Sequence, residues 1–162
     1  LGNAMTINNH LRFGSFTAIL IFAIASCFSL IALHAAENET MPLAINLDDV
    51  PWGQVGGGNG SPLGLRTARQ GVDPETGGVT YYAMFPAGTH FDLHWHTHDE
   101  FVSVQKGSVV LELGDETFTL NAGAYIVIPG KMNHSWDVPE QGEVVILVRR
   151  AGPADRTYVE PH

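Results

Sequence analysis

Residues Gly88 to Glu100 read GTHFDLHWHTHDE, and three of their histidines alternate with other residues before the closing glutamate. Successive side chains of a β-strand point to opposite faces, so His94, His96, His98 and Glu100 would share one face of an extended segment. Imidazole nitrogens and a carboxylate on one face form a ligand set for a divalent transition metal. The stretch therefore predicts a metal site, although an HxH pair on its own is more often a surface cluster.

A second histidine block follows the apolar run AYIVI at residues 124–128. The first block has the spacing Gly88-x5-His94-x-His96-x3-Glu100-x6-Gly107, and the second has Gly123-x5-Pro129-x4-His134. In this order, the two blocks resemble the two signature motifs of the cupin superfamily. The resemblance covers residues 80–150, and its first motif is the more specific of the two.

The resemblance implies that His94, His96, Glu100 and His134 hold one divalent metal ion per chain. Three nitrogens and one carboxylate suit Fe(II), Mn(II), Ni(II), Cu(II) or Zn(II), and the general order of metal affinities does not choose among them. The second motif usually has a glycine where this chain has Lys131 and an asparagine where it has Val138. Neither position supplies a ligand, so the departure concerns the shape of the turn before His134.

The composition favours a single all-β domain. The chain has 162 residues, 18 glycines and 9 prolines, and only 15% of its residues are charged, a pattern typical of short strands joined by turns. A net charge of -9 argues against nucleic acid as a partner. The single cysteine, Cys27, lies in an apolar N-terminal run, so a metal in the remaining chain must be held by nitrogen and oxygen.

Residues 1–36 are interpreted as a remnant of expression (residues 1–4) followed by a signal peptide. Arg12 precedes the apolar run 16–33, and Ala35 and Ala36 then provide a small-residue cleavage site. The same run is long enough for an uncleaved membrane anchor, and a lipidated Cys27 is the third reading. All three predict export to the periplasm or the cell exterior, and the membrane is a partner only if the run is retained or Cys27 is lipidated.

The rest divides into a connector at 37–63 and a domain at 64–162 with its motif core at 88–138. The glycine-rich segment VGGGNGSP at 55–62 predicts a surface loop, because it lacks the Lys-Ser/Thr ending of a phosphate-binding loop. No helical period appears after Glu37. Besides the strand that carries the histidines, strands are expected at 43–47, 65–70, 79–85, 100–105, 109–113, 118–120, 125–128, 135–138, 144–149 and around Tyr158.

Eight to ten short strands without helices predict a sandwich or barrel. The resemblance makes this a cupin-type jelly-roll β-barrel, also known as a double-stranded β-helix. A single small barrel has edge strands that invite pairing with another chain, so we expect a homodimer in which residues 43–47 and 65–70 cover an edge of the second subunit.

Several residues near the motifs are predicted to act on a small-molecule ligand or substrate. His98 and Tyr82 are the candidate catalytic acids or bases, and Tyr81, Phe85, Phe91 and Trp136 are predicted to line the substrate pocket. Of Arg149 and Arg150, at most one can pair with a substrate carboxylate, because adjacent strand residues face opposite ways.

Three functions remain open at this point. The first is a metalloenzyme of dioxygenase, isomerase or lyase type that acts on a small organic molecule. The second is a non-catalytic domain that binds or senses a small ligand. The third is a protein whose metal only stabilises the fold. Because cupins include all three, the resemblance does not choose among them.

Overall fold

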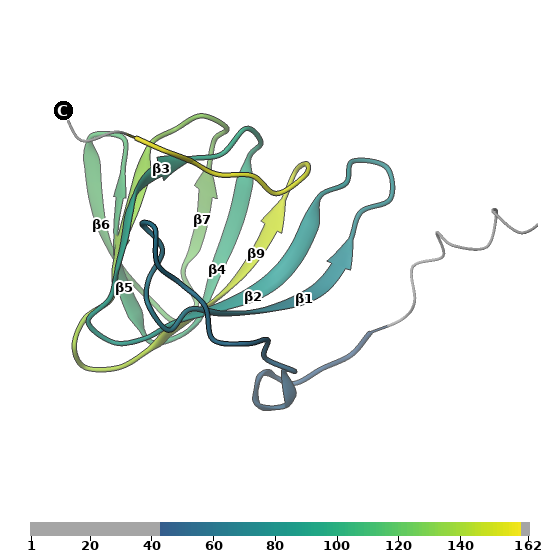
Figure 1. Cartoon of the computed structure of the whole chain (residues 1–162), viewed down its shortest axis with the longest axis horizontal. Helices are drawn as coiled ribbons and strands as arrows, with labels where there is room; N and C mark the ends of the chain where they lie inside the picture. The colour runs from purple at the N-terminus through teal and green to yellow at the C-terminus, as the bar shows by residue number, and fades with distance from the viewer. Residues whose placement is uncertain (1–42, 160–162) are drawn as a thin grey trace, which may run out of the picture. The chain divides into compact units, whose positions relative to one another are not determined.

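The computed structural model describes residues 43–159, which form two antiparallel sheets (Figure 1). One sheet has the order β1-β2-β9-β4-β7 and the other has the order β10-β3-β8-β5-β6. The strands within the described range are β1 (Arg66–Val72), β2 (Val79–Phe85), β3 (His90–Trp95), β4 (Glu100–Lys106), β5 (Ser108–Leu113), β6 (Glu116–Asn121), β7 (Tyr125–Ile128), β8 (His134–Asp137), β9 (Val144–Arg150) and β10 (Thr157–Tyr158). The expected all-β class is confirmed.

The core lies between the two sheets and follows the alternation of the sequence. In β5, Val109 and Leu111 are fully buried while Glu112 is exposed, as a strand with one face on a core requires. The turn between β4 and β5 depends on Gly107, whose φ of 78° is in the left-handed region. An added Cβ there would lie 2.3 Å from the carbonyl oxygen of Glu143, so no other residue fits without movement of the backbone.

The strand expected at residues 43–47 is not present. Leu43 is 60% exposed, and a short 3-10 helix, η1 (Leu47–Asp49), follows instead. The Asn46 side-chain amide donates a hydrogen bond to the Asp49 carboxylate at 3.0 Å, so a local turn competes with an extended conformation. Further along the chain, Gly53 contacts the β1 edge of the first sheet, where its N–H donates a hydrogen bond to the Thr67 carbonyl at 2.9 Å.

The glycine-rich segment 55–62 is irregular, as expected, and it packs against the second sheet. The Gly60 carbonyl accepts a hydrogen bond from the Asp92 N–H at 2.9 Å, and the Ser61 hydroxyl lies 3.1 Å from the Tyr158 hydroxyl. The predicted signal peptide lies outside the described residues. Within residues 43–159, no helix is long and apolar enough to cross a membrane.

Candidate metal centre and its cavity

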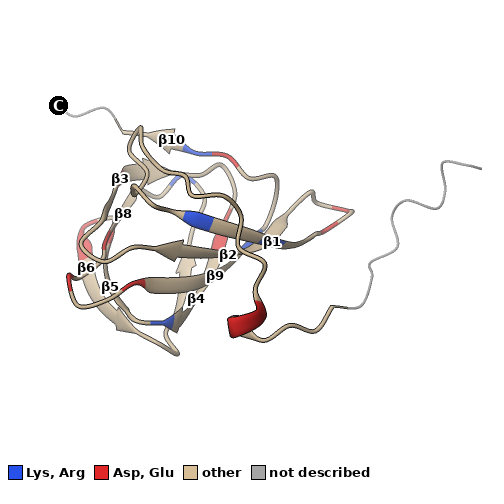
Figure 2. Ribbon diagram, turned by 60° about the horizontal axis from the view of Figure 1, so that its bottom comes forward, with Lys and Arg blue, Asp and Glu red and all other residues tan. Residues whose placement is uncertain are grey.

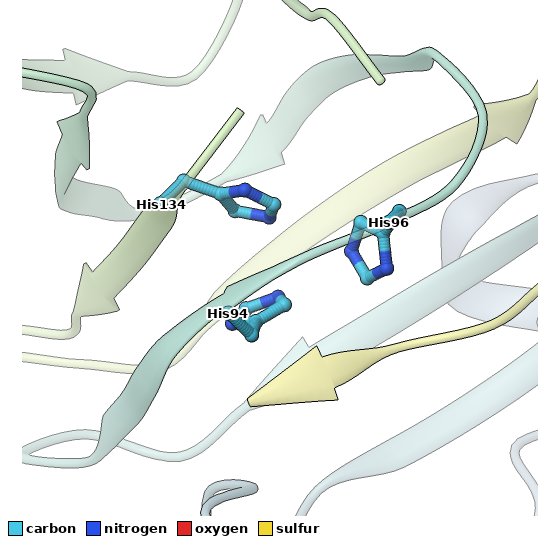
Figure 3. Close-up of side chains that lie close together, drawn as sticks. All are labelled: His94, His96 and His134. Atoms are coloured by element: carbon cyan, nitrogen blue, oxygen red, sulfur yellow. The ribbon is translucent and has the colours of Figure 1, made fainter. Parts of the chain in front are cut away.

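Three histidines from both sequence motifs converge inside the barrel. His94 belongs to β3, His96 to the loop that follows it, and His134 to β8, which pairs with β3 so that His94 lies opposite His134. Figure 3 shows the three rings turned toward one another. One potential ligand atom from each ring lies within 4.8 Å of the other two, and all three side chains are buried.

Each of these rings has one nitrogen bound to a backbone carbonyl. His94 Nδ1 lies 2.6 Å from the Asp92 oxygen, His96 Nδ1 lies 2.6 Å from the Asp155 oxygen, and His134 Nδ1 lies 3.0 Å from the Met132 oxygen. A carbonyl only accepts, so Nδ1 must carry the hydrogen in every case. In this tautomer Nε2 carries a lone pair, which is the form of imidazole that ligates a metal. The Nε2 atom of His96 also lies 3.0 Å from Arg150 Nη2, which can donate to it.

Burial also keeps two of the imidazoles neutral. Loss of solvation, reinforced by the neighbouring His134, lowers the pKa of His94 to about 3. Burial likewise lowers the pKa of His134 below its usual value. At neutral pH both rings are unprotonated and can act as ligands.

The Glu100 carboxylate, from the start of β4, completes a buried group of hydrogen-bond acceptors. Its Oε2 lies 3.3 Å from His96 Nε2 and 3.8 Å from His134 Nε2. Burial raises the pKa of Glu100, but the positive charge of the nearby Arg150 guanidinium opposes this effect, and the net shift of the pKa is downward, so the group is ionised at neutral pH. Within the described residues, Glu100 Oε2 and His134 Nε2 have no hydrogen-bond partner. Lone pairs that face one another without a donor fit a bound cation.

Two hydrogen bonds join the loop of the first motif to the turn of the second. The Lys131 N–H donates to the His96 carbonyl at 2.7 Å, and the Gly130 N–H donates to the Asp99 carboxylate at 2.7 Å. Lys131 adopts a φ of 65°, the left-handed conformation that glycine favours. The turn therefore places a lysine in a conformation that glycine adopts more readily.

A cavity of about 620 Å³ opens beside the histidines, between the two sheets. The four residues predicted to line a substrate pocket all line it: Tyr81, Phe85, Phe91 and Trp136. The Phe91 ring stacks on His94 with centroids 4.2 Å apart, so the aromatic wall of the cavity is continuous with the histidine cluster. A mostly apolar cavity with a few convergent polar groups is typical of a small-molecule site.

The structure does not bring the two predicted catalytic residues, His98 and Tyr82, into this cavity. His98 is exposed beyond the end of β3, and its ring packs against Gly152. The strand ends at Trp95, so the alternation of side chains that predicted a shared face does not extend to His98. Tyr82 faces the opposite side of β2 from Tyr81 and packs against Trp52, with ring centroids 6.4 Å apart. Tyr81 is the tyrosine of this pair that lines the cavity.

The structure adds functional residues that the motifs did not indicate. Asp155 positions His96 through its backbone carbonyl, and its carboxylate accepts a hydrogen bond from the Thr97 N–H at 3.0 Å. Arg69, Arg156 and Tyr158 also line the cavity. The segment between β9 and β10, which contains Asp155 and Arg156, crosses one end of the barrel (Figure 1). Because these contacts span up to 59 residues of sequence, spacing alone gave no signal for them.

These features define a class of protein: a small two-sheet β-barrel with buried histidines from two motifs beside an internal cavity. Residues 81–149 match the family model described as a cupin domain. Residues 81–149 therefore form a cupin domain.

Solved structures with the same fold are only distantly similar in sequence. KdgF from Halomonas sp. is 23% identical over 69% of this chain and 94% of its own, with a TM-score of 0.55. The polyketide cyclase RemF from Streptomyces resistomycificus is 18% identical over 75% of this chain and 88% of its own, with a TM-score of 0.57. A structure from work on the DMSP lyases RdDddP and RnDddQII is 16% identical over 59% of this chain, with a TM-score of 0.53. The match spans about half, 53%, of that structure's chain. No curated protein sequence gave a significant match.

Proposed function

We propose that this chain is a metal-dependent cupin that acts on a small organic molecule in its internal cavity, by a reaction of dioxygenase, isomerase or lyase type. The observation that carries the proposal is the buried group of acceptors: the Nε2 atoms of His94, His96 and His134 together with Glu100 Oε2. A bound cation would satisfy the two of these four buried atoms that have no hydrogen-bond partner among the described residues, Glu100 Oε2 and His134 Nε2. We assign these four residues as the ligands of one divalent ion.

A divalent ion bound there would polarise an oxygen of the substrate or lower the pKa of a bound water. Among the chain's own groups, Tyr81 is placed to move a proton. Burial, and then the negative charge of Glu100, raise the pKa of the Tyr81 hydroxyl, so it stays protonated at neutral pH. Its oxygen accepts a hydrogen bond from Arg150 Nη2 at 3.2 Å, which leaves its own hydrogen free to be donated to a ligand in the cavity.

The names of similar structures support an enzyme without selecting a reaction. They include a cyclase and lyases, so this fold accommodates such chemistry, while fold alone does not assign it. The alternative is a non-catalytic domain that binds or senses a small ligand around a structural metal. It is favoured by the positions of His98 and Tyr82, because neither of these acid or base candidates lines the cavity.

Metal analysis and ligand binding test the proposal together. Untagged protein should contain close to one divalent ion per chain by elemental analysis. Oxygen ligands that chelate through two atoms should change the visible spectrum of the cobalt-substituted protein, because four protein ligands leave about two positions open. Glu100→Gln should weaken this response. A protein that holds the ion but never responds to such ligands would have a closed, purely structural metal site.

We also propose that the mature chain is exported, on the basis of the apolar run 16–33 and the small residues Ala35 and Ala36. Mass spectrometry of the protein from its native host should find an N-terminus near Glu37. An intact N-terminus in the cytosolic fraction would contradict export, and a lipid on Cys27 would select the lipoprotein alternative.

A further inference from the structure

A buried arginine stands beside the metal centre with most of its hydrogen-bonding capacity unused. Arg150, at the end of β9, is only 6% exposed. Its Nη2 lies 3.0 Å from His96 Nε2 and 3.2 Å from the Tyr81 hydroxyl. Among residues 43–159, its Nε and Nη1 have no acceptor. A guanidinium carries five N–H donors in a planar fork, and leaving them unpaired in a buried site is costly.

Neutralising Glu100 does not account for this arrangement. Arg150 Nη2 approaches Glu100 Oε1 at 3.5 Å, which is longer than a charge-assisted hydrogen bond, and the fork does not engage the carboxylate through two parallel bonds. Arg150 therefore retains donors for a second anion, one that the protein does not provide.

Positive charge is concentrated around the same cavity. Arg69 of β1 and Arg156, which immediately precedes β10, also line it, and basic positions on β1 and beside β10 can be followed in Figure 2. The Arg156 guanidinium lies over the rings of Phe91 and Tyr158, 5.1 Å and 4.9 Å from their centroids. Within the described residues neither Arg69 nor Arg156 forms an ion pair with a carboxylate.

This concentration stands out against an acidic chain. The net charge is -9 and the chain contains only eight lysines and arginines. One of these, Arg12, lies outside the described residues, and three of the other seven line this one cavity. Of the two acidic residues in the lining, Glu100 faces the histidines, and the Asp155 carboxylate accepts from the Thr97 N–H. A cavity lined in this way attracts anions.

We propose that the cavity binds a small organic carboxylate that carries a second oxygen donor. The carboxylate accepts hydrogen bonds from N–H groups of Arg150 that have no acceptor within the described residues, and the second oxygen faces the histidine cluster. Arg69 and Arg156 attract the anion from the exposed part of the cavity. This inference rests on the proposed function, and it narrows the substrate class from any bidentate oxygen ligand to an anionic one.

The test compares lactate with its neutral amide, lactamide, on the full chain. Calorimetry measures binding to the cobalt-loaded protein and to the chelator-treated protein, and the visible cobalt spectrum reports access to the metal. The parent chain should bind lactate at least about tenfold more tightly than lactamide, since charge-assisted hydrogen bonds to a carboxylate are stronger than those to a neutral amide. Arg150→Gln should remove this preference for lactate over lactamide in both forms of the protein.

Arg149→Gln is the matched control. Arg149 is the adjacent residue on the same strand, but it is exposed and stacks over Phe101, with its guanidinium carbon 5.5 Å from the ring centroid. Its loss removes the same charge from the opposite face of β9, and the preference for lactate should persist. If Arg150→Gln does not fold, the double variant Arg69→Gln/Arg156→Gln tests the proposal at two exposed positions. It should weaken lactate binding at least about threefold and flatten its salt dependence.

The outcomes separate this inference from the proposed function. Equal binding of lactate and lactamide by the folded parent chain, with a cobalt spectrum that responds to both, would overturn the anion proposal and leave the metal-dependent function intact. Failure of the chain to bind any divalent ion would overturn the proposed function. In that case, lactate binding to the metal-free protein that depends on Arg150 would still support an anion site.

Discussion

His94, His96 and His134 each donate from Nδ1 to a backbone carbonyl, so their orientation does not depend on the metal. This preorganisation predicts that removal of one ring affects metal binding far more than folding. His96→Ala should lower the metal content at least about tenfold and leave the far-UV circular dichroism nearly unchanged.

His90→Ala is the matched control for this substitution. His90 lies at the start of β3, half-exposed and paired with Asp137 at 2.7 Å, and it does not line the cavity. Elemental analysis should find the parent metal content in this variant. Full metal retention in His96→Ala would remove His96 from the ligand set.

The lowered pKa values predict how the stability of the metal-free protein depends on pH. His94 has a pKa of about 3 in the folded chain compared with 6.5 for an unperturbed histidine, and the pKa of His134 shifts in the same direction. Between these values the unfolded chain binds more protons, so stability is full above pH 6.5 and declines as the pH falls toward 3. For His94 the decline should approach about 1.4 kcal/mol per pH unit, and His134 contributes in the same direction.

Urea unfolding of chelator-treated protein at neutral pH and at about pH 5 measures this slope. His94→Asn should make it shallower, because one of the groups that resist protonation is gone. A parent slope no steeper than that of the variant would show that His94 titrates normally in the folded chain.

At the scale of elements, the turn between β7 and β8 provides a test of backbone strain. Lys131 has a φ of 65° and its N–H holds the His96 carbonyl. A β-carbon in this conformation costs about 1–2 kcal/mol, and glycine avoids that cost. Lys131→Gly should therefore be more stable than Lys131→Ala by about 1 kcal/mol.

The comparison between these two variants isolates the energetic cost of the backbone conformation, because both variants lack the lysine side chain. In the parent chain, the ammonium of that side chain lies 5.8 Å from the centroid of the Trp95 ring. Thermal unfolding of both proteins in the metal-bound form measures the difference. An alanine variant at least as stable as the glycine variant would mean that the turn relaxes out of the left-handed conformation.

Most of what the sequence could predict about the strands came from the local alternation of apolar and polar side chains. The bounds of β2 and β7 matched the expected ranges, because Val, Ile and aromatic residues alternate there between clear turn signals. Parity also required Arg149 and Arg150 to face opposite ways, and only Arg150 is buried. The alternation of side chains could not predict which of Tyr81 and Tyr82 faces inward, because these two adjacent residues of the strand are both tyrosines.

Contacts that depend on tertiary structure were not accessible from the sequence. The backbone carbonyl of Asp155 accepts from His96 across the end of the barrel, and every residue type has such a carbonyl. The positions of Arg69 and Arg156 at the cavity likewise follow from how β1 and the segment before β10 cross the fold. The motifs predicted that His94, His96 and His134 lie together, whereas the charge of the cavity required the assembled molecule.

At the scale of the whole molecule, the two edges of the first sheet differ in whether another segment of the chain forms hydrogen bonds with them. Residues 53–56 contact the edge of β1, with the Gly53 and Gly56 N–H groups donating to the carbonyls of Thr67 and Leu65 at 2.9 Å and 2.8 Å. In the described part of the chain, β7 is the other end of this sheet and pairs with β4 alone. Its outward residues are apolar, with Tyr125 67% exposed and Val127 47% exposed.

We therefore retain the prediction of a homodimer and expect the β7 edge, rather than residues 43–47 and 65–70, to form the contact. An uncovered strand edge with an apolar face favours association with a second copy. Light scattering at micromolar concentration should give the mass of two chains, and Val127→Lys should shift the protein toward monomer. Leu63→Lys places the same charge at another exposed apolar residue, 74% accessible in a loop, and should leave the dimer intact. A monomeric mass for the parent chain would contradict the dimer, and a dimer insensitive to Val127→Lys would place the interface elsewhere.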